Sequence, residues 1–373
     1  MKSFPIEPTV LFTNFPSQSG KIKITYLEYI SEITNVFKIK NDSECMKKYL
    51  IDALDNFKNK KILVMGDVML DKFSFGEINR VNPEQPAAPL VRIIKENYIL
   101  GGAANVANNI VALGANCTLY CVLGRDFCGK MINKICENKK IRIRGFFNNN
   151  PTIMKQRVIA HGQQISRMDF GERKIKKINE RLQNKIIDSL KKEIKNYDFV
   201  ILSDYDKSFF TKYFSSQIIN LTKESDIPIL ADPKPCNLDF FRGCSLISPN
   251  KKEAEEMTGI KYSNEKNVLT KMAEELSKKI ESKNIIITCG EDGVFDYCDG
   301  ETDFVGTVAR EVADVTGAGD TFAAIIALGL ASGLNISDAI RLGNYASGIV
   351  VGKIGTATTN IKEIKEILEK DNN

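Results

Sequence analysis

The chain has 373 residues, 43% of them hydrophobic and 27% charged, which is the composition of a globular domain with an ample core. Its net charge is +5, and its basic residues are interspersed with 47 acidic residues. This charge distribution argues against nucleic-acid binding and fits small phosphorylated ligands better. No run of 18 or more apolar residues occurs, so we expect no membrane contact.

Residues 1–58 differ in pattern from the rest and are predicted to be an N-terminal extension, partly helical. Ser43, a suitable helix N-cap, precedes apolar residues at helical spacing from Met46 to Phe57. We expect this arm to dock on the main domain or on another subunit. The first residues lack the apolar core of a secretion signal.

From residue 59 to 366 the pattern alternates between strands and helices. Strands are expected at 61–65, 117–122, 198–202, 228–231, 245–247 and 284–288, and helices at 102–113, 126–138, 180–195, 213–224, 252–258 and 265–282. This alternation predicts an α/β fold whose mostly parallel sheet is covered on both faces. Ligands of such sheets lie at the carboxyl ends of the strands. Residues 367–373 are predicted to be a tail.

Two regions near 72–99 and 141–170 interrupt the alternation with β-prone segments punctuated by Gly, Pro and Asn. We expect them to form a small strand lid that excludes water from the site. Nine cysteines without a CxxC pair, and a single histidine, His161, argue against a zinc site. Reduced cysteines of this kind favour a cytoplasmic location.

The most informative segment runs from Asp314 to Asp320, Asp-Val-Thr-Gly-Ala-Gly-Asp, and an apolar helix is expected to follow it. Free amides at the start of a helix attract phosphate. A carboxylate in the same turn would repel phosphate, so Asp320 makes chemical sense as a base that takes a proton from an attacking hydroxyl. A glycine turn with Asp320 as a helix cap is the alternative.

Two motifs could bind the hydroxyls of a sugar. Asp67 and Asp71 follow the first strand, and their carboxylates could accept bonds from several hydroxyls or could cap a loop. Gly101 and Gly102 precede a helix and permit close backbone approach, while Asn105 both donates and accepts. A tight turn explains the glycine pair equally well.

A cationic pair lies on a predicted lid strand. Lys155 and Arg157 are two residues apart, so their side chains share one face and could hold a substrate phosphate. A solvated strand face is the alternative.

The predicted nucleotide side carries weaker patterns. Asn250 and Glu253 lie on one helical face and offer oxygen ligands for hydrated Mg²⁺, although helix capping explains them almost as well. Thr288, Gly290 and Gly293 follow a buried strand and could line a nucleotide pocket or form a plain turn. Asn344, on a late helix of small residues, could face the base.

Together these residues resemble the ribokinase-like (PfkB) carbohydrate kinases. The likeness extends from about Lys60 to Ile364 and rests above all on Asp314–Asp320 and on Gly-Gly-Ala-Ala-Asn at 101–105. Within that family the sequence is most similar to the heptose 7-phosphate 1-kinases, in the segments 66–71, 80–86, 151–158 and 163–169. The resemblance implies a three-layer α/β sandwich with a small β-strand lid. It also implies phosphorylation of an anomeric hydroxyl with ATP and Mg²⁺.

The resemblance also implies residue roles. Asp320 would be the base, and the amides of Gly317, Ala318 and Gly319 would bind the transferred phosphoryl group. Asn250 and Glu253 would organise Mg²⁺. Sugar hydroxyls would meet Asp67, Asp71, Gly101, Gly102 and Asn105, and the sugar phosphate would meet Lys155 and Arg157. The ATP cleft would contain Ser203, Lys234, Asn250, Thr288, Gly290, Gly293 and Asn344. A monovalent cation such as K⁺ would lie near Asp314 and Thr316.

Family resemblance further implies a homodimer built through the lid. The nucleotidyltransferase domain often fused to this kinase is not present in the sequence, so a separate enzyme is expected to perform that step. Another sugar kinase of the same fold and a non-catalytic sugar-phosphate sensor are the alternatives. A dinucleotide-dependent oxidoreductase is disfavoured, because no GxGxxG follows the first strand.

Overall fold

The computed structural model describes residues 44–370 apart from 81, 86, 308–313 and 354. The chain divides into two units, Met1–Met46 and Lys47–Asn373, and all elements named below belong to the second. The predicted cap Ser43 and the last three residues of the predicted tail lie outside the described residues. The first part of that tail continues a helix, α10 (Ile361–Lys370), in which Leu368 is buried.

A nine-stranded sheet forms the centre of the second unit, in the order β13-β12-β11-β10-β9-β8-β1-β4-β5. β1 pairs in parallel with β4 and β8, whereas β12 is antiparallel to both β11 and β13. The prediction of a mostly parallel sheet is therefore confirmed, with an unpredicted antiparallel hairpin at one edge. The strands are β1 (Lys61–Gly66), β4 (Asn116–Gly124), β5 (Arg142–Asn148), β8 (Phe199–Ser203), β9 (Ile229–Asp232), β10 (Leu246–Ile247), β11 (Asn284–Thr288), β12 (Val294–Cys298) and β13 (Glu301–Val305).

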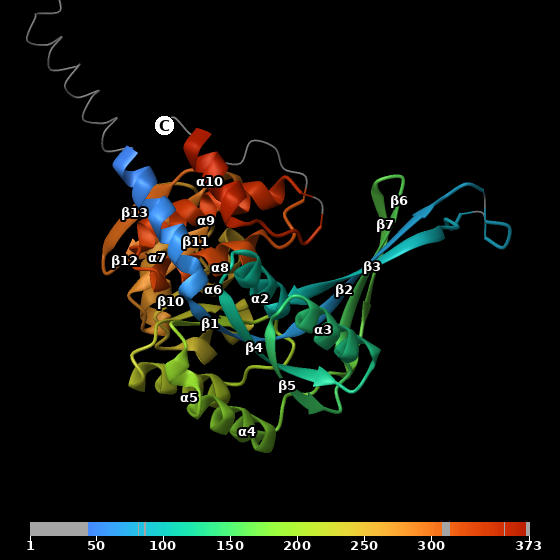
Figure 1. The fold of residues 1–373 in the computed structure, drawn as a ribbon, viewed down its shortest axis with the longest axis horizontal. Helices are drawn as coiled ribbons and strands as arrows, with labels where there is room; N and C mark the ends of the chain where they lie inside the picture. The colour runs from blue at the N-terminus through green and yellow to red at the C-terminus, as the bar shows by residue number, and fades with distance from the viewer. Residues whose placement is uncertain (1–43, 81, 86, 308–313, 354, 371–373) are drawn as a thin grey trace, which may run out of the picture. The chain divides into compact units, whose positions relative to one another are not determined.

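Helices cover both faces of this sheet, because its central strands are apolar on both sides (Figure 1). Ile62 and Val64 of β1 belong to one core, and the intervening Leu63 and Met65 belong to the other. The first core includes α2 (Ala103–Ala112), α3 (Phe127–Asn138), α8 (Ala318–Ala331), α9 (Ile336–Val351) and α10. The second includes α4 (Glu180–Lys191), α5 (Lys212–Glu224), α6 (Lys251–Thr258) and α7 (Lys266–Ile280). The result is the expected three-layer sandwich.

The predicted strands and helices of the alternating region are confirmed, with small shifts at their ends. The helix predicted at 180–195 ends earlier, at Lys191, and a short 3₁₀ turn, Ile194–Asn196, follows. One assignment was wrong: the second lid segment was predicted to begin near residue 141, but β5 pairs with β4 in the main sheet. Periodicity identifies a strand there but not the sheet that it joins.

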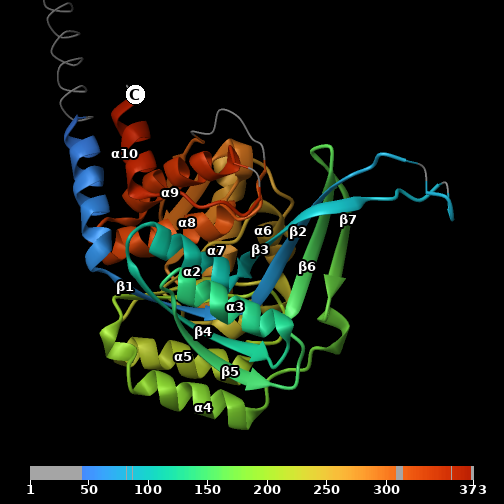
Figure 2. The ribbon, with the colours of Figure 1, turned by 45° about the vertical axis from the view of Figure 1, so that its right-hand side comes forward.

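The lid is a separate four-stranded sheet in the order β3-β2-β6-β7. Its strands are β2 (Val68–Glu77), β3 (Arg92–Gly102), β6 (Ile153–Ala160) and β7 (Gln163–Phe170), and Figure 2 shows them projecting to the right of the main sheet. Register places Asp71 opposite Lys155 and Phe73 opposite Arg157, so these four side chains share one face.

A helix over residues 47–56 precedes β1, and the 3₁₀ turn Phe57–Asn59 follows it. Leu50, Leu54 and Phe57 are buried in the first core, and Lys365 of α10 forms an ion pair with Asp55 at 2.7 Å. This part of the predicted extension therefore belongs to the second unit and packs against its core. No helix in the described ranges has the length and apolar character needed to cross a bilayer.

Candidate active site

A cleft of about 170 Å³ opens where β8, β9 and β11 end and α8 begins. It lies at the carboxyl ends of parallel strands, where the sequence predicted a ligand site. The residues lining it are Tyr205, Asp232, Lys234, Ser248, Asn250, Glu253, Thr288, Gly317, Gly319, Asp320 and Phe322. Seven of these were predicted site residues, so the structure brings most of the predicted phosphate and nucleotide side together.

The glycine-rich loop ends at Gly317, the N-cap of α8, which has φ 85°. A side chain at Gly317 would approach the Asn105 amide nitrogen to 3.1 Å, whereas one at Gly319 would meet no atom within 4 Å. The Ala318 amide donates to the Val315 carbonyl at 3.3 Å. Since the first amides of a helix have no intrahelical acceptors, this open turn can receive an anion.

Asp320 lies in the first turn of α8 and is 8% exposed. It does not cap the helix; instead its carboxylate accepts bonds from Asn105 Nδ2 at 2.7 Å and Tyr205 Oη at 2.8 Å. Burial raises the pKa of Asp320 to about 6, against the opposing effect of those two bonds. A carboxylate with this pKa is ionised at neutral pH and is a stronger base than an exposed one.

The glycine pair places Asn105 opposite Asp320. Gly102 has φ 61°, and a Cβ there would lie 2.4 Å from the Asp67 carbonyl oxygen, so only glycine fits this turn into α2. A Cβ on Gly101 would lie 2.5 Å from Asp71 Oδ2. Asn105 Oδ1 is buried without a hydrogen-bond partner among the described residues. An unpaired buried acceptor is costly, and a ligand hydroxyl would satisfy it.

The two predicted hydroxyl-binding aspartates have different surroundings. The Asp67 carboxylate accepts three backbone bonds at 3.0–3.1 Å, from Tyr205, Lys207 and Phe209. Burial raises the pKa of Asp67 to about 6, and these amides oppose the shift. Its acceptor capacity is largely used, which favours the alternative that Asp67 caps a loop.

Asp71 is held by the lid instead. Arg157 Nη1 donates to Asp71 Oδ1 at 2.9 Å and lies over the Phe73 ring at 5.3 Å. Lys155 Nζ lies over the Tyr205 ring at 5.9 Å, and no described carboxylate lies within salt-bridge distance of it. Burial lowers the pKa of Lys155. The two predicted cations therefore differ: Arg157 is paired with Asp71, whereas Lys155 has no ion-pair partner in the described chain.

Asn250 and Glu253 form a capping box at the start of α6, so the capping alternative holds for their local geometry. Glu253 Oε1 also accepts from Lys234 Nζ at 2.5 Å. Asp232, half-buried at the end of β9, lines the same cleft, and its removal from water together with the Glu253 charge raises its pKa to about 8. Among the described residues no three acidic, cysteine or histidine side chains form a metal cage. Asp232 and Glu253, together with Asn250, offer oxygen atoms that suit a hydrated cation that keeps most of its water.

The remaining predicted nucleotide residues take part mainly in protein contacts. Gly293 has φ 124°, and a Cβ there would overlap the Val305 carbonyl, while Asn344 Nδ2 donates to the carbonyls of Val305 and Gly306. Gly290 has φ 69° in a 3₁₀ turn. Ser203 Oγ is buried without a hydrogen-bond partner in the described chain. Only Thr288 of the predicted 288–293 segment lines the cleft.

The loop predicted to hold a monovalent cation is tied to residues near 355. Asp314 accepts from the amides of Thr316 at 2.9 Å and Gly355 at 3.0 Å. Thr356 Oγ1 is buried without a described partner. The preceding residues 308–313 lie outside the described chain.

Sequence reasoning missed four residues that line the cleft: Ser248, Phe322, Tyr205 and Asp232. Tyr205 and Asp232 stand at or just beyond the carboxyl end of a strand, which was the available indication. Nothing local predicted that Tyr205 would reach Asp320, because the two are 115 residues apart.

Comparison with known proteins identifies the family. The model of the pfkB family carbohydrate kinases matches residues 59–363. The chain belongs to this family. It is therefore an ATP-dependent carbohydrate kinase, and the family implies a divalent metal beside the nucleotide.

Two curated relatives are named bifunctional protein HldE. The one from Nitratiruptor is 40% identical over 306 residues and the one from Aliarcobacter butzleri 40% identical over 311 residues. The alignments cover 82% and 83% of this chain but 64% of each relative, so the chain matches about two thirds of their length.

Solved structures show the same fold. Arabidopsis thaliana ribokinase complexed with ribose and ATP has a TM-score of 0.65 at 20% identity, covering 83% of this chain and 99% of that one. Escherichia coli phosphofructokinase-2 in complex with potassium has a TM-score of 0.68 at 17% identity, with coverage of 83% and 98%. At these identities the likeness concerns the fold.

Proposed function

We propose that this kinase transfers the γ-phosphoryl group of ATP to the anomeric hydroxyl of D-glycero-D-manno-heptose 7-phosphate. The product would be the 1,7-bisphosphate, a cytoplasmic intermediate of ADP-heptose and lipopolysaccharide synthesis. The observation that carries the reaction type is the buried Asp320 carboxylate at the glycine-rich start of α8. The 40% identity to the HldE relatives supports the choice of sugar.

In the proposed mechanism Asp320 accepts the proton of the attacking hydroxyl while the phosphoryl group passes to that oxygen. The amides of Gly317 and Gly319 bind the transferred group, and the Ala318 amide joins them if it leaves the Val315 carbonyl. Positioning and electrostatics supply most of the rate in phosphoryl transfer. General-base catalysis contributes about 10²–10⁴-fold.

The nucleotide phosphates lie over the cleft in this proposal, near Lys234 and Thr288. Asp232, Asn250 and Glu253 would hold Mg²⁺ through its water shell. When bound, this ion neutralises charge on the phosphates. Ser203, Gly290, Gly293 and Asn344 would lie along the ATP cleft, as the family resemblance implies.

On the sugar side we assign hydroxyl binding to Asp71 and to the unpaired Asn105 Oδ1, with Gly101 allowing close approach. Lys155 binds the 7-phosphate, because it is a partly buried cation without a described ion-pair partner. Arg157 orients Asp71, and Asp67 and Gly102 hold the surrounding backbone.

Two further parts of the proposal concern assembly and ions. A monovalent cation such as K⁺ would bind near Asp314, Thr316 and the unpaired Thr356 hydroxyl. A homodimer would form through the lid, whose edge strands β3 and β7 expose Ile94 and Phe170. Sedimentation at increasing protein concentration, with and without K⁺, tests both.

The experiment that tests the function is ADP release with Mg²⁺-ATP and four acceptors: the heptose 7-phosphate, sedoheptulose 7-phosphate, fructose 6-phosphate and ribose. We expect selective turnover of the heptose 7-phosphate and a 1,7-bisphosphate by NMR. Preference for another acceptor would replace the sugar assignment. No turnover despite ATP binding would favour the sugar-phosphate sensor.

Asp320→Asn is the matched variant, because it keeps the shape and removes the base. We expect kcat to fall by at least about 10²-fold with ATP binding retained. An unchanged kcat would refute the role of Asp320.

A further inference from the structure

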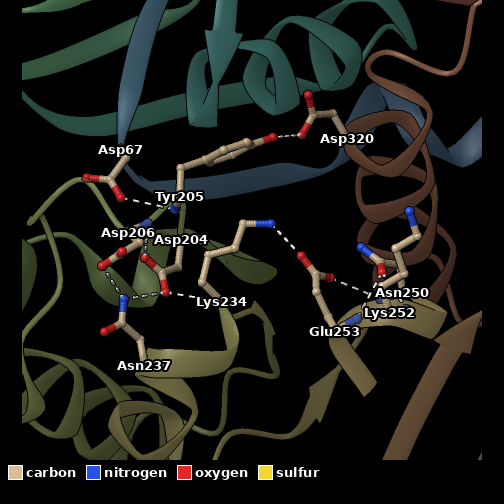
Figure 3. Close-up of polar contacts among 10 residues, drawn as sticks. All are labelled: Asp67, Asp204, Tyr205, Asp206, Lys234, Asn237, Asn250, Lys252, Glu253 and Asp320. Atoms are coloured by element: carbon tan, nitrogen blue, oxygen red, sulfur yellow. Dashed lines mark hydrogen bonds and ion pairs between the residues drawn. The ribbon is translucent and has the colours of Figure 1, made fainter. Parts of the chain in front are cut away.

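Tyr205 lies on a loop whose backbone is fixed from two sides (Figure 3). Asp67 accepts three amides of residues 205–209. Asp204 accepts the Asp206 amide at 2.8 Å, and its other oxygen binds the Lys234 amide at 3.1 Å and Asn237 Nδ2 at 3.0 Å. Two buried carboxylates thus bind the chain before and after Tyr205, so little backbone movement is left at this residue.

The Tyr205 side chain is fixed as well. Its hydroxyl donates to Asp320 Oδ1 at 2.8 Å, and its ring lies 5.9 Å from Lys155 Nζ and 5.5 Å from Lys234 Nζ. Both contacts are cation–π interactions, one from the lid and one from the nucleotide side of the cleft. Burial, and then the Asp320 charge, raise the pKa of the phenol well above its usual range, so it remains a donor at neutral pH.

The Asp320 carboxylate consequently has one donor on each oxygen. Asn105 holds Oδ2 at 2.7 Å and Tyr205 holds Oδ1. The distribution of the terminal side-chain torsion angle of aspartate is broad and roughly two-fold, so without such donors the carboxylate can rotate. Two donors from different elements fix its plane, and each oxygen keeps acceptor capacity for an incoming hydroxyl.

We propose that Tyr205 is a positioning residue of this kinase, whose hydroxyl fixes the Asp320 carboxylate and favours its ionised form. This inference rests on the proposed function, in which Asp320 accepts the proton of the sugar hydroxyl. No proton passes through Tyr205, and the phenol contacts the base rather than the reacting atoms. Its place between Lys155 and Lys234 keeps the hydroxyl directed at Asp320 when either end of the cleft binds a phosphate.

Tyr205→Phe tests the proposal, because it removes the hydroxyl and keeps the ring with both lysine contacts. We expect kcat to fall on the order of tenfold, as for loss of one hydrogen bond to a charged group. The KM for ATP should stay within about twofold. Because the lost bond favours the ionised carboxylate, the acidic limb of the kcat–pH profile should move to higher pH. A purely structural role would not move this limb.

A second measurement needs no turnover and separates this inference from the proposed function. In protein labelled at the aspartate γ-carbons, the NMR signal missing in Asp320→Asn identifies Asp320. Its titration midpoint should be higher in Tyr205→Phe than in the wild type. The same midpoint in both proteins would overturn the proposal, even if no sugar were turned over.

Tyr120→Phe is the matched control. Tyr120 is fully buried and also donates to a carboxylate, that of Glu193, beside α4. Its loss should leave kcat, the acidic limb and the Asp320 midpoint unchanged. Equal effects of the two substitutions would refute a specific role for Tyr205. A raised KM for ATP with unchanged kcat in Tyr205→Phe would also refute it, by making Tyr205 a nucleotide contact.

Discussion

Asn105→Asp replaces the donor that faces Asp320 with a second carboxyl group of the same shape. The Asn105 nitrogen is 2.7 Å from Asp320 Oδ2, so an oxygen at that position would face another oxygen at hydrogen-bond distance. Two negative charges about 4 Å apart repel by about 4 kcal/mol at an effective dielectric constant of 20. At 1.36 kcal/mol per pKa unit this is a shift of about three units.

The shift adds to a pKa that burial already raises to about 6 in the wild type. The pair would therefore retain one proton at pH 7 and titrate as a unit. Since the base must be ionised to accept a proton, kcat/KM at pH 7 should fall on the order of 10²-fold and recover partly toward pH 9. Recovery at high pH distinguishes the like-charge effect from a loss of structure.

The assay is ADP release between pH 6 and 9, with thermal unfolding measured in the same buffers. A carboxyl pKa raised in the folded state gives stability that is lost as pH rises toward that pKa, so Asn105→Asp should unfold progressively more easily, relative to the wild type, from pH 6 to pH 9. Asn108→Asp, another buried position of α2, controls for burying a carboxyl group. Wild-type kcat/KM at pH 7 in Asn105→Asp would refute the assignment of Asp320 as the base.

Three other predictions follow from the site. Gly102→Ala should destabilise the protein by about 2 kcal/mol or more, because it combines a positive φ with overlap on the Asp67 carbonyl. The control Gly162→Ala, with φ 77° and no atom within 4 Å, should cost only the backbone penalty. Equal losses of unfolding free energy for the two variants in urea would contradict the overlap. Lys155→Met should raise the KM for the heptose 7-phosphate on the order of tenfold or more and leave that for ATP unchanged; unchanged sugar-phosphate kinetics would locate the phosphate elsewhere. The kcat of the wild type should fall below about pH 6 as Asp320 becomes protonated. The same fall should be seen with an unphosphorylated sugar, which has no phosphate group that titrates in this range.

The sequence alone predicted most strands and helices of the alternating region, though not the β12–β13 hairpin, and a glycine-rich turn before an apolar helix. Both are local properties: period-2 and period-3.6 patterns report burial along a segment, and a glycine loop before an apolar helix reports free amides. It also predicted that residues from separate strand ends would gather, because parallel strands end on the same edge.

Only the tertiary structure decided which partner each polar side chain meets. Asp67 and Asp71 are four residues apart and looked equivalent, yet one binds the amides of residues 205–209 and the other binds Arg157. Asn105 and Tyr205 reach Asp320 across 215 and 115 residues. Hydrogen bonds and pKa values depend on what lies within a few ångströms, and sheet order, rather than any local pattern, brings those groups together.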